Sequence, residues 1–387
     1  MIYLDNAATT HPKPQMVNSA VIKALSYSAN PGRAGHRMSI KASETVFNCR
    51  NKLCNLFNFD KPENVILTPG CTYSLNMVIK GTLSKGDHVV ISSFEHNSVL
   101  RPIQKLSDSD YITYTVADVF EADNERTLES FRKAMQDNTK LVICTHASNV
   151  SGIKLPIYSI GSLAHYYGAL FCVDGAQTAG IHNIDMGSDS PIDFLCLPGH
   201  KGLYGPMGTG VLIINTNYAI DSLCEGGTGS STIDFKHPQI LPDKLESGTL
   251  NLPGIAGLSA GVDFVTRKTT DAILKHEINL MKKLYHSLSH MNNVILYTQE
   301  PDINNHAPLL SFNIKDTDSE EVSYLLDKNY SIATRAGIHC SPLAHKYMKT
   351  DKTGTVRICP SAFTTEYDIN MLERAIYNIS KFKKITK

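Results

Sequence analysis

Short, mostly apolar runs rich in β-branched residues alternate with amphipathic stretches between residues 64 and 214. A strand that is apolar throughout is expected where both faces of a sheet are covered. The seven predicted strands cover residues 64–67, 88–92, 111–115, 141–145, 170–174, 194–197 and 210–214. The helices predicted between them cover residues 72–83, 98–106, 127–137 and 157–167. This order predicts the α/β fold class, with a large domain in which helices flank a mostly parallel sheet of seven strands.

The pattern changes after residue 252. A long helical stretch over 255–291, with a break near 267–270, precedes shorter elements. These are strands near 294–297, 309–314, 331–334 and 355–358, and helices over 319–327 and 366–382. The first residues contain Pro12 and Pro14, which predict an arm ahead of a helix that starts near Gln15. We therefore expect a large domain over 15–252 and a smaller α+β domain made of 1–14 and 253–387.

The charge balance excludes some classes of partner. Lys plus Arg number 37 and Asp plus Glu number 37, so the formal net charge is zero. Binding nucleic-acid phosphates calls for a basic excess, so we expect no nucleic-acid partner. No apolar run reaches the ~18 residues of a membrane span. The N-terminal segment also lacks the basic and apolar parts of a signal peptide, so we expect no membrane association.

The nine cysteines are scattered, without a Cys-x-x-Cys pair or a Cys/His cluster at zinc spacing. This pattern predicts reduced thiols, no bound metal and a cytoplasmic location. Cys144, Cys172 and Cys196 lie in apolar runs and are expected in the core, whereas Cys340 lies in a polar, turn-rich segment.

The segment 194–210 (FLCLPGHKGLYGPMGTG) leads from an apolar strand through His200 and Lys201 into a glycine-rich loop. Glycines let the backbone turn sharply and approach a ligand closely. A lysine at the end of a buried strand is costly unless it is paired, neutralised or used covalently. Two interpretations stay open here: a lysine that forms a Schiff base, or a solvated lysine in a surface loop.

The segment 170–179 (LFCVDGAQTA) ends an apolar strand at Asp174, and Gln177 follows three residues later. In open α/β sheets, ligands bind beyond the carboxyl ends of the strands. A buried carboxylate there needs a cation, and a protonated pyridine nitrogen is the cation that pyridoxal phosphate enzymes pair with an acidic residue. The alternative is an aspartate that caps the next turn.

Two further segments follow strands. In 67–76 (LTPGCTYSLN), Cys71 and Thr72 begin a helix after a Pro-Gly turn. The free N–H groups and the dipole of a helix start favour an anion such as phosphate, although a plain N-cap by Thr72 explains the pattern too. The Gly-Lys-Ser/Thr of a P-loop is absent, which argues against a nucleotide triphosphatase. In 92–98 (SSFEHNS), His96 either stacks on a flat cofactor or is an ordinary loop histidine.

The segment 333–343 (ATRAGIHCSPL) places Cys340 beside Arg335 and His339. Nearby positive charge lowers the pKa of a thiol and makes Cys340 a nucleophile candidate, whereas an incidental surface thiol is the alternative. In 354–358 (GTVRI), Arg357 either binds a carboxylate bidentately, which suits an amino-acid substrate, or forms a structural salt bridge.

Together, the order and spacing of these motifs resemble the class V aminotransferase-like family of fold-type I pyridoxal phosphate enzymes. Within that family the chain looks like the short-loop (group II) cysteine desulfurases and selenocysteine lyases. The resemblance covers nearly the whole chain. It rests on YLDNAATT (3–10), HASN (146–149), VDGAQ (173–177), GHKGLYGP (199–206), ESGT (246–249) and RAGIHC (335–340). The short spacing between Arg335 and Cys340 is similar to that group, in which the cysteine sits on a structured loop.

The resemblance implies a role for each candidate residue. The implied roles toward the cofactor are a Schiff base with pyridoxal 5'-phosphate for Lys201, pairing with the pyridine nitrogen for Asp174, a hydrogen bond to the phenolate oxygen for Gln177, and ring stacking for His96. The helix start after Cys71, together with Thr72 and His200, would hold the phosphate.

On the substrate side, the resemblance implies that Arg357 binds the carboxylate and that Asn149 lies near the ring and the substrate. Arg335 and His36, the latter on an entrance segment, are further substrate-binding candidates. The implied catalytic groups are Lys201, His96 and Cys340, which would accept sulfur.

Two positions depart from the family pattern. Pro198 stands where the family often has a serine, and Leu252 stands where it often has a threonine that reaches the partner subunit's phosphate. Both changes remove a phosphate hydroxyl. Thr249, Asn251 and the segment 226–231 (GGTGSS) are candidates to compensate.

The implied reaction converts L-cysteine to L-alanine and leaves the sulfur on Cys340 as a persulfide, with L-selenocysteine as a second possible substrate. The resemblance also implies a homodimer with shared active sites and an acceptor protein for the sulfur or selenium. The alternatives are a class V aminotransferase or kynureninase-like lyase, neither of which needs Cys340, and a catalytically silent scaffold of the same fold.

Overall fold

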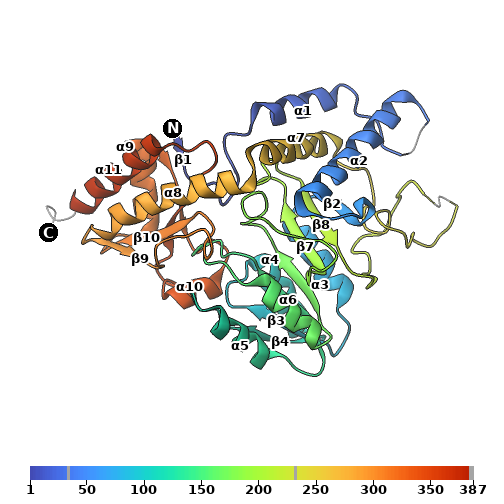
Figure 1. Cartoon of the computed structure of the whole chain (residues 1–387), viewed down its shortest axis with the longest axis horizontal. Helices are drawn as coiled ribbons and strands as arrows, with labels where there is room; N and C mark the ends of the chain where they lie inside the picture. Colours follow the sequence, from blue (N-terminus) through green and yellow to red (C-terminus); the bar gives the residue numbers. More distant parts are fainter. Residues whose placement is uncertain (33–34, 231–232, 383–387) are drawn as a thin grey trace.

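The computed structural model describes residues 1–32, 35–230 and 233–382. The seven predicted strands form one sheet in the order β2-β8-β7-β6-β5-β3-β4 (Figure 1). They are β2 (Val65–Thr68), β3 (His88–Ser92), β4 (Thr113–Ala117), β5 (Thr139–Thr145), β6 (Leu170–Asp174), β7 (Phe194–Pro198) and β8 (Gly210–Ile214). The strands from β4 across to β7 pair in parallel, whereas β8 is antiparallel to both β7 and β2. The predicted α/β fold with a mostly parallel sheet of seven strands is confirmed.

Two cores, one on each face of this sheet, explain why its strands are apolar throughout. Val142 belongs to one core, while its neighbours Leu141 and Ile143 belong to the other. Val173 and Cys172 are divided in the same way, because successive side chains of a strand point to opposite faces. Helices cover both faces: α2 (Arg37–Phe57), α3 (Cys71–Thr82), α4 (Asn97–Asp108), α5 (Asn124–Ala134), α6 (Ile157–Tyr166) and α7 (Leu252–Lys268). The helix α1 (Gln15–Leu25) packs on the outside of α7 (Figure 1).

The parallel arrangement gathers the segments that follow the strands. The carboxyl ends of β3, β5, β6 and β7 lie at one edge of the sheet, because parallel strands all point the same way. His96, Asn149, Asp174 and Lys201 all lie at or shortly after these ends. The topology therefore brings four sequence-distant candidate residues to one edge.

A second, antiparallel sheet has the order β12-β13-β10-β9. Its strands are β9 (Val294–Leu296), β10 (Leu310–Ile314), β12 (Arg335–Gly337) and β13 (Thr355–Ile358). It shares a separate apolar core with residues of α8 (Thr270–Ser289), α9 (Ser319–Tyr330) and α11 (Glu366–Phe382). At the N-terminus, β1 (Ile2–Tyr3) pairs with β11 (Ile332–Ala333), so the first residues of the chain lie beside its C-terminal part (Figure 1).

The elements that were not predicted from the sequence include α2, β12 and α10, besides the two-residue β1 and a 3-10 turn at Pro62–Asn64. In α2, the buried residues Ala42, Val46, Cys49 and Leu53 recur at helical spacing, so a usable signal was present. β12 spans three residues and α10 (Pro342–Met348) spans seven, and segments this short carry no readable period. The predicted break in the long helix is confirmed: it falls at Thr269, whose φ is 66° and whose hydroxyl accepts a hydrogen bond from Ala272.

The position of the domain boundary follows from the apolar core in which each helix packs. Leu252, Ile255 and Leu258 of α7 pack in a core of the large sheet, whereas Leu280 and Leu284 of α8 pack in the core of the small one. We propose that the boundary lies between α7 and α8, near Thr269, instead of at residue 252. The pairing of β1 with β11 supports the proposal that the N-terminal arm belongs to the smaller domain.

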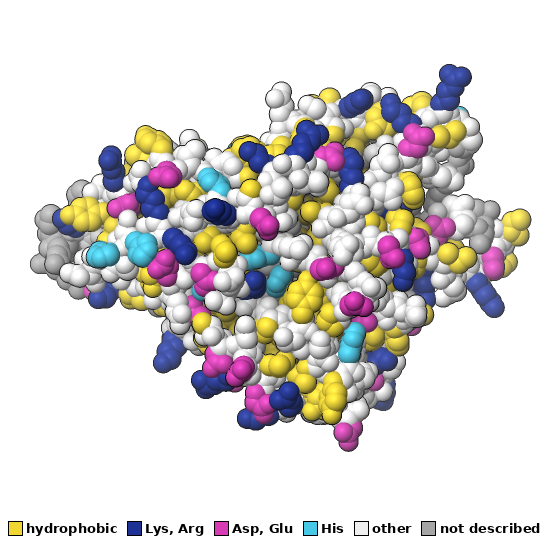
Figure 2. Space-filling model, in the orientation of Figure 1, with side chains coloured by type: hydrophobic (Ala, Val, Ile, Leu, Met, Phe, Trp, Pro, Cys, Tyr) yellow, Lys and Arg dark blue, Asp and Glu magenta, His cyan; other side chains and the backbone are white. Residues whose placement is uncertain are grey.

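Acidic and basic side chains are interspersed over the face of the molecule seen in Figure 2, in keeping with the zero net charge. Among the residues that the structure describes, no helix has the length and apolar character needed to cross a bilayer.

Candidate active site

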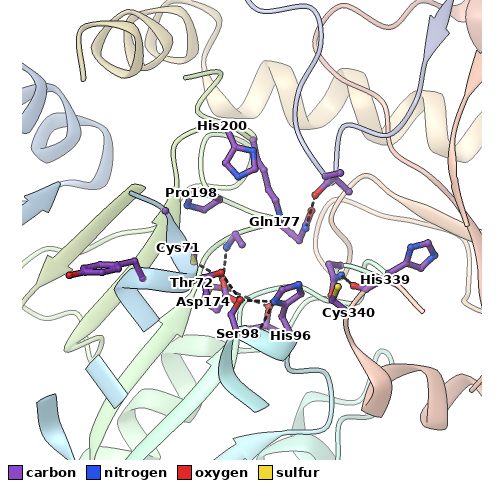
Figure 3. A pocket seen from close by; sticks show the side chains of 18 of the residues that line it. Cys71, Thr72, His96, Ser98, Asp174, Gln177, Pro198, His200, His339 and Cys340 are labelled. Atoms are coloured by element: carbon purple, nitrogen blue, oxygen red, sulfur yellow. Dashed lines mark hydrogen bonds between the residues drawn. The ribbon is translucent and has the colours of Figure 1, made fainter. Parts of the chain in front are cut away.

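A cavity of about 730 Å³ lies where the carboxyl edge of the large sheet meets the C-terminal part of the chain (Figure 3). Every residue to which the resemblance assigns a catalytic, cofactor-binding or substrate-binding role lines this cavity, except His36. The lining candidates are Cys71, Thr72, His96, Asn149, Asp174, Gln177, His200, Lys201, Arg335, Cys340 and Arg357. The fold therefore brings together groups that are up to 286 positions apart in the sequence (357 − 71).

Lys201 follows β7 and takes part in none of the ion pairs found among the described residues. Burial lowers the pKa of its ammonium group, and the charge of Asp174 acts in the opposite direction. Lowering the pKa increases the neutral fraction of the amine, which is the form that acts as a nucleophile or a base.

The peptide that precedes Lys201 is held by the N-terminal arm. The carbonyl of His200 accepts hydrogen bonds from the Thr9 hydroxyl (3.1 Å), the Thr10 N–H (3.1 Å) and Lys13 Nζ (2.7 Å). The Thr10 hydroxyl also donates to the carbonyl of Lys201 (3.0 Å). Sequence reasoning missed this function of the arm, although both threonines lie in the YLDNAATT segment that carries part of the resemblance.

Asp174 ends β6 and is buried, with 3 % of its surface exposed. Its Oδ1 accepts hydrogen bonds from Ala176 N–H (2.9 Å) and from the Cys71 thiol (3.4 Å). It forms no ion pair among the described residues. A buried carboxylate with no cationic partner in the protein is suited to a cationic ligand.

The start of α3 forms the second wall of the cavity. Cys71 and Thr72 are its first residues, so their N–H groups have no partner within the helix. His200 lies nearby on the lining with a buried Nδ1 that has no hydrogen-bond partner, and burial lowers its pKa to about 4. Neutral N–H donors and a helix N-terminus are suited to an anion. Pro198, also on the lining, offers no hydroxyl.

His96 caps α4. Its Nδ1 accepts a hydrogen bond from Ser98 N–H (3.0 Å) and lies 2.8 Å from the Ser98 hydroxyl, which in turn lies 2.7 Å from the Thr72 hydroxyl. Burial lowers the pKa of His96, so the neutral ring carries its proton on Nε2 because Nδ1 accepts. Ser98 lines the cavity but was not predicted; a serine two residues after a histidine at a helix start is the signal that identifies it.

Cys340 is exposed and lies in the four-residue loop between β12 and α10, on the opposite side of the cavity from Thr72 and Ser98 (Figure 3). Its neighbour His339 is buried, and burial lowers the pKa of that ring to about 2. His339 is therefore neutral near pH 7 and adds no positive charge to the thiol. Two positively charged neighbours were expected beside Cys340, His339 and Arg335, and only Arg335 is charged.

Arg335 and Arg357 lie directly opposite each other on β12 and β13, so both side chains reach the same face. Arg357 is paired with Asp5 (2.8 Å) and donates to the carbonyl of Asn149 (2.8 Å), yet its Nε has no partner. The structural salt bridge considered for Arg357 is therefore present. It leaves the N–H at Nε without a partner among the described residues. Arg335 forms no ion pair among the described residues.

Asn149 and His36 differ in where the structure places them. Asn149 lines the cavity, but its side-chain amide is engaged by the residues on either side of Cys340: Nδ2 donates to the His339 carbonyl (2.7 Å), and Oδ1 accepts from the Ser341 hydroxyl (2.6 Å). His36 is exposed and caps α2, where its Nδ1 accepts from Ser39 N–H (3.2 Å), and it does not line the cavity of its own chain.

The residues expected to compensate for Pro198 and Leu252 do not line this cavity either. Leu252 is buried in the core as the first residue of α7, and Asn251 caps that helix by accepting from Gly254 N–H (3.1 Å). Thr249 lines a separate groove beside Asn251. The described part of segment 226–231 lines grooves beside Gly32, and Ser231 lies outside the described residues.

Comparison with known proteins shows the family of the chain. The family Aminotransferase class-V matches residues 2–372. A protein of Methanothermobacter thermautotrophicus described as a probable cysteine desulfurase is 32% identical over 390 residues, covering 98% of this chain and 94% of the relative. One of the same description from Halalkalibacterium halodurans is 32% identical over 396 residues, covering 99% and 94%.

Solved structures give the same result. The apo structure of a cysteine desulfurase from Thermococcus onnurineus is similar with a TM-score of 0.90 and 29% identity, covering 98% of this chain and 94% of that one. The cysteine desulfurase CsdA of Escherichia coli is similar with a TM-score of 0.85 and 26% identity, covering 97% and 94%.

Proposed function

This chain belongs to the aminotransferase class-V family, and we propose that it is a cysteine desulfurase that converts L-cysteine to L-alanine and keeps the sulfur on Cys340 as a persulfide. The observation that carries the proposal is that one cavity is lined by Lys201, Asp174 and Cys340. The first two are the groups that pyridoxal phosphate chemistry needs, and the third is a nucleophile for sulfur transfer.

Enzymes of this family depend on pyridoxal phosphate, and the residues present fit that cofactor. The buried Asp174 forms no ion pair with any residue that the structure describes and would pair with the pyridine nitrogen. The unpaired N–H groups of Cys71 and Thr72, with the orphaned Nδ1 of His200, would hold the phosphate. Lys201 would hold the cofactor covalently. When bound, the cofactor supplies an electron sink for the α-carbon of the substrate.

The residues of the cavity divide the proton transfers between them. Lys201 Nζ, once neutral, accepts the α-proton of the substrate, because burial favours the uncharged amine. His96 presents an N–H at Nε2, so it donates a hydrogen bond into the cavity and does not accept one there. Gln177, held by its bond to the carbonyl of Ala7 (3.2 Å), would contact the phenolate oxygen of the cofactor.

Arg357 and Cys340 act on the substrate itself. The free donors of Arg357 bind the α-carboxylate. The Cys340 thiolate forms a bond to the substrate sulfur, and the carbon–sulfur bond breaks. The electron pair of that bond stays on the β-carbon, which takes up a proton, and Lys201 returns the α-proton to the α-carbon to give L-alanine. The sulfur remains on Cys340 as a persulfide, so the step needs no external oxidant or reductant.

Further parts of the proposal concern partners. We propose a homodimer, because exposed apolar side chains concentrate on α2 and on the long loop that projects at the right of Figure 1: Met38, Ile40, Phe47, Phe235 and Ile240. An acceptor protein would remove the persulfide sulfur from the exposed Cys340. Analytical ultracentrifugation of the wild type and of Phe47→Glu tests the dimer, which the charged variant should dissociate.

A paired product assay tests the activity. Purified protein with pyridoxal phosphate is given L-cysteine with a reductant or, separately, L-selenocysteine. The proposal predicts equal amounts of L-alanine and sulfide from L-cysteine. Turnover of L-selenocysteine alone would make the protein a selenium-directed lyase. Alanine without sulfide from other amino acids would indicate an aminotransferase or another lyase, and a protein that never binds the cofactor would be a scaffold.

A further inference from the structure

The loop that carries Cys340 has an unusual backbone. His339 and Cys340 have φ angles of 50° and 60°, two successive residues in the left-handed region. Residues with a side chain seldom adopt this region, and such a conformation persists only where the surrounding structure enforces it. Contacts from both sides of the cavity enforce it here: the His339 ring lies 3.0 Å from the carbonyl of Thr355 on β13, and further contacts come from the large-sheet side.

Three hydrogen bonds connect the loop to the large-sheet side of the cavity. Asn149 Nδ2 donates to the carbonyl before Cys340, that of His339 (2.7 Å), and the Ser341 hydroxyl donates to Asn149 Oδ1 (2.6 Å). The carbonyl of Cys340 itself accepts from Asn97 N–H (2.8 Å). The peptide groups on both sides of the cysteine are therefore fixed to elements of the large sheet.

The direction of these bonds is unambiguous. A carbonyl only accepts, so the Asn149 group beside the His339 carbonyl must be the NH₂ of the amide. Its Oδ1 then faces Ser341, whose hydroxyl must donate. With 9 % and 0 % of their surfaces exposed, Asn149 and Ser341 make these bonds away from bulk water, where a lost partner is costly.

Ser341 gives up its usual function to make this contact. It is the N-cap residue of α10, a position where a serine commonly accepts a hydrogen bond from the helix, yet its side chain forms no such cap. The hydroxyl is directed to Asn149 instead. Asn149 also accepts a hydrogen bond from Arg357 at its carbonyl (2.8 Å), so one residue connects the arginine that would bind the substrate with the loop of the nucleophile.

We propose that Asn149 and Ser341 are positioning residues for Cys340, which hold its sulfur in place for attack on the substrate sulfur. This inference rests on the proposed desulfurase function. Ser341 acts through Asn149 and the loop backbone, and it is not among the residues that line the cavity. Its removal therefore leaves the cofactor and substrate contacts in place, whereas a change of Asn149 alters the lining.

The test compares Ser341→Ala with Ser319→Ala. Ser319 is a matched control because it is also buried and lies in α9, away from the cavity. Its hydroxyl likewise donates one hydrogen bond to a residue distant in the sequence, at the carbonyl of Thr353 (2.9 Å). Single-turnover mixing with L-cysteine, acid quench and peptide mass analysis measure persulfide formation on Cys340. We expect a roughly tenfold slower rate for Ser341→Ala, because attack depends on alignment. The KM for L-cysteine and the visible absorbance of the bound cofactor should not change.

A second readout does not depend on turnover. The N–H of Asn97 is at the start of α4, so it has no partner within the helix and its protection against hydrogen exchange comes from the Cys340 carbonyl. We expect its exchange to be at least tenfold faster in Ser341→Ala and unchanged in Ser319→Ala. Ser341→Cys, which keeps the size and a weaker donor, should give intermediate values and substitutes for the alanine variant if that variant does not fold.

The outcomes separate the two proposals. Equal persulfide rates and equal Asn97 exchange in Ser341→Ala and Ser319→Ala overturn the positioning role while leaving the desulfurase intact. A wild type that forms no persulfide overturns the proposed function and the positioning role with it, even if the exchange data show that the loop is held.

Discussion

The two sides of the cavity are built in different ways. On the large-sheet side, Asp174 and Lys201 lie at the ends of parallel strands whose cores fix them from both faces. On the C-terminal side, Cys340 lies in a short loop of left-handed residues, fixed by hydrogen bonds from Asn149 and Asn97. The first side is rigid because of where its residues lie in the sheet, and the second because of a few polar contacts. Changes on the two sides should therefore have separable effects.

The largest effect is expected for Lys201→Ala. Without the amine that would hold the cofactor, the variant should lose the visible absorbance of the bound cofactor together with all turnover of L-cysteine. Absorbance spectra and product assays measure both. Lys80→Ala, in the last turn of α3, serves as a control and should keep both. A Lys201→Ala protein with wild-type absorbance and activity would exclude Lys201 as the covalent site.

Asp174→Ala should have the next largest effect. The variant removes the carboxylate that would keep the pyridine nitrogen protonated, so kcat should fall by roughly a hundredfold or more, the usual loss for a preorganised electrostatic group. Persulfide formation on Cys340 should slow to the same extent, because attack by the thiolate follows the removal of the α-proton, which depends on the bound cofactor. Steady-state kinetics at saturating cofactor measure the effect, and a kcat within threefold of the wild type would contradict the assigned role.

Arg357→Lys tests the C-terminal side with a smaller change. Lysine keeps the positive charge but not the planar fork that binds a carboxylate and Asp5 together, so KM for L-cysteine should rise roughly tenfold. The absorbance of the bound cofactor should stay as in the wild type. A change in that absorbance with an unaltered KM would place Arg357 on the cofactor side of the cavity instead.

The pH dependence of stability should involve both sides. Burial lowers the pKa of His182, near the large sheet, and of His345, in α10, to about 4 each. Their folded-state pKa values lie below the ordinary 6.5, so between about pH 4 and 6.5 the unfolded state binds more protons, and stability is lost as the pH falls.

Substitution by asparagine should remove that loss. The free energy of unfolding of His182→Asn or His345→Asn, relative to the wild type, should rise as the pH falls from 6.5 towards 4, by up to about 1.4 kcal/mol per pH unit. Urea unfolding at pH 5 and pH 7 measures it. Burial raises the pKa of Glu95 to about 8, an effect of opposite sign that cancels in the comparison. A difference that does not vary with pH would show that these histidines titrate normally.

Sequence patterns predicted the large-sheet side well. Each strand there is buried by cores on both faces, so its residues are apolar throughout, and the polar residues that end it stand out. The motif around Lys201 and the one around Asp174 could be identified for that reason. The carboxyl ends of parallel strands lie along one edge of a sheet, where ligands bind, which is why polar residues at these ends were candidates for a site.

The C-terminal side was less predictable because its decisive features are tertiary. The bond between Ser341 and Asn149 joins residues 192 positions apart, and nothing in either segment indicates the other. From its position next to Cys340 in the sequence, His339 was expected to add positive charge, but burial lowers its pKa and keeps the ring neutral. The support of His200 by Thr9, Thr10 and Lys13 was missed for the same reason: it links residues across almost two hundred positions.

The most direct test of the central claim is the mass of the peptide that contains Cys340 after the protein reacts with one equivalent of L-cysteine. The wild type is expected to gain one sulfur atom on that peptide for each L-alanine formed. Cys340→Ala should keep the absorbance of the bound cofactor and form no L-alanine from L-cysteine. Sulfur-free wild-type peptide alongside L-alanine, or wild-type turnover of L-cysteine by Cys340→Ala, would contradict the assignment of Cys340 as the sulfur acceptor.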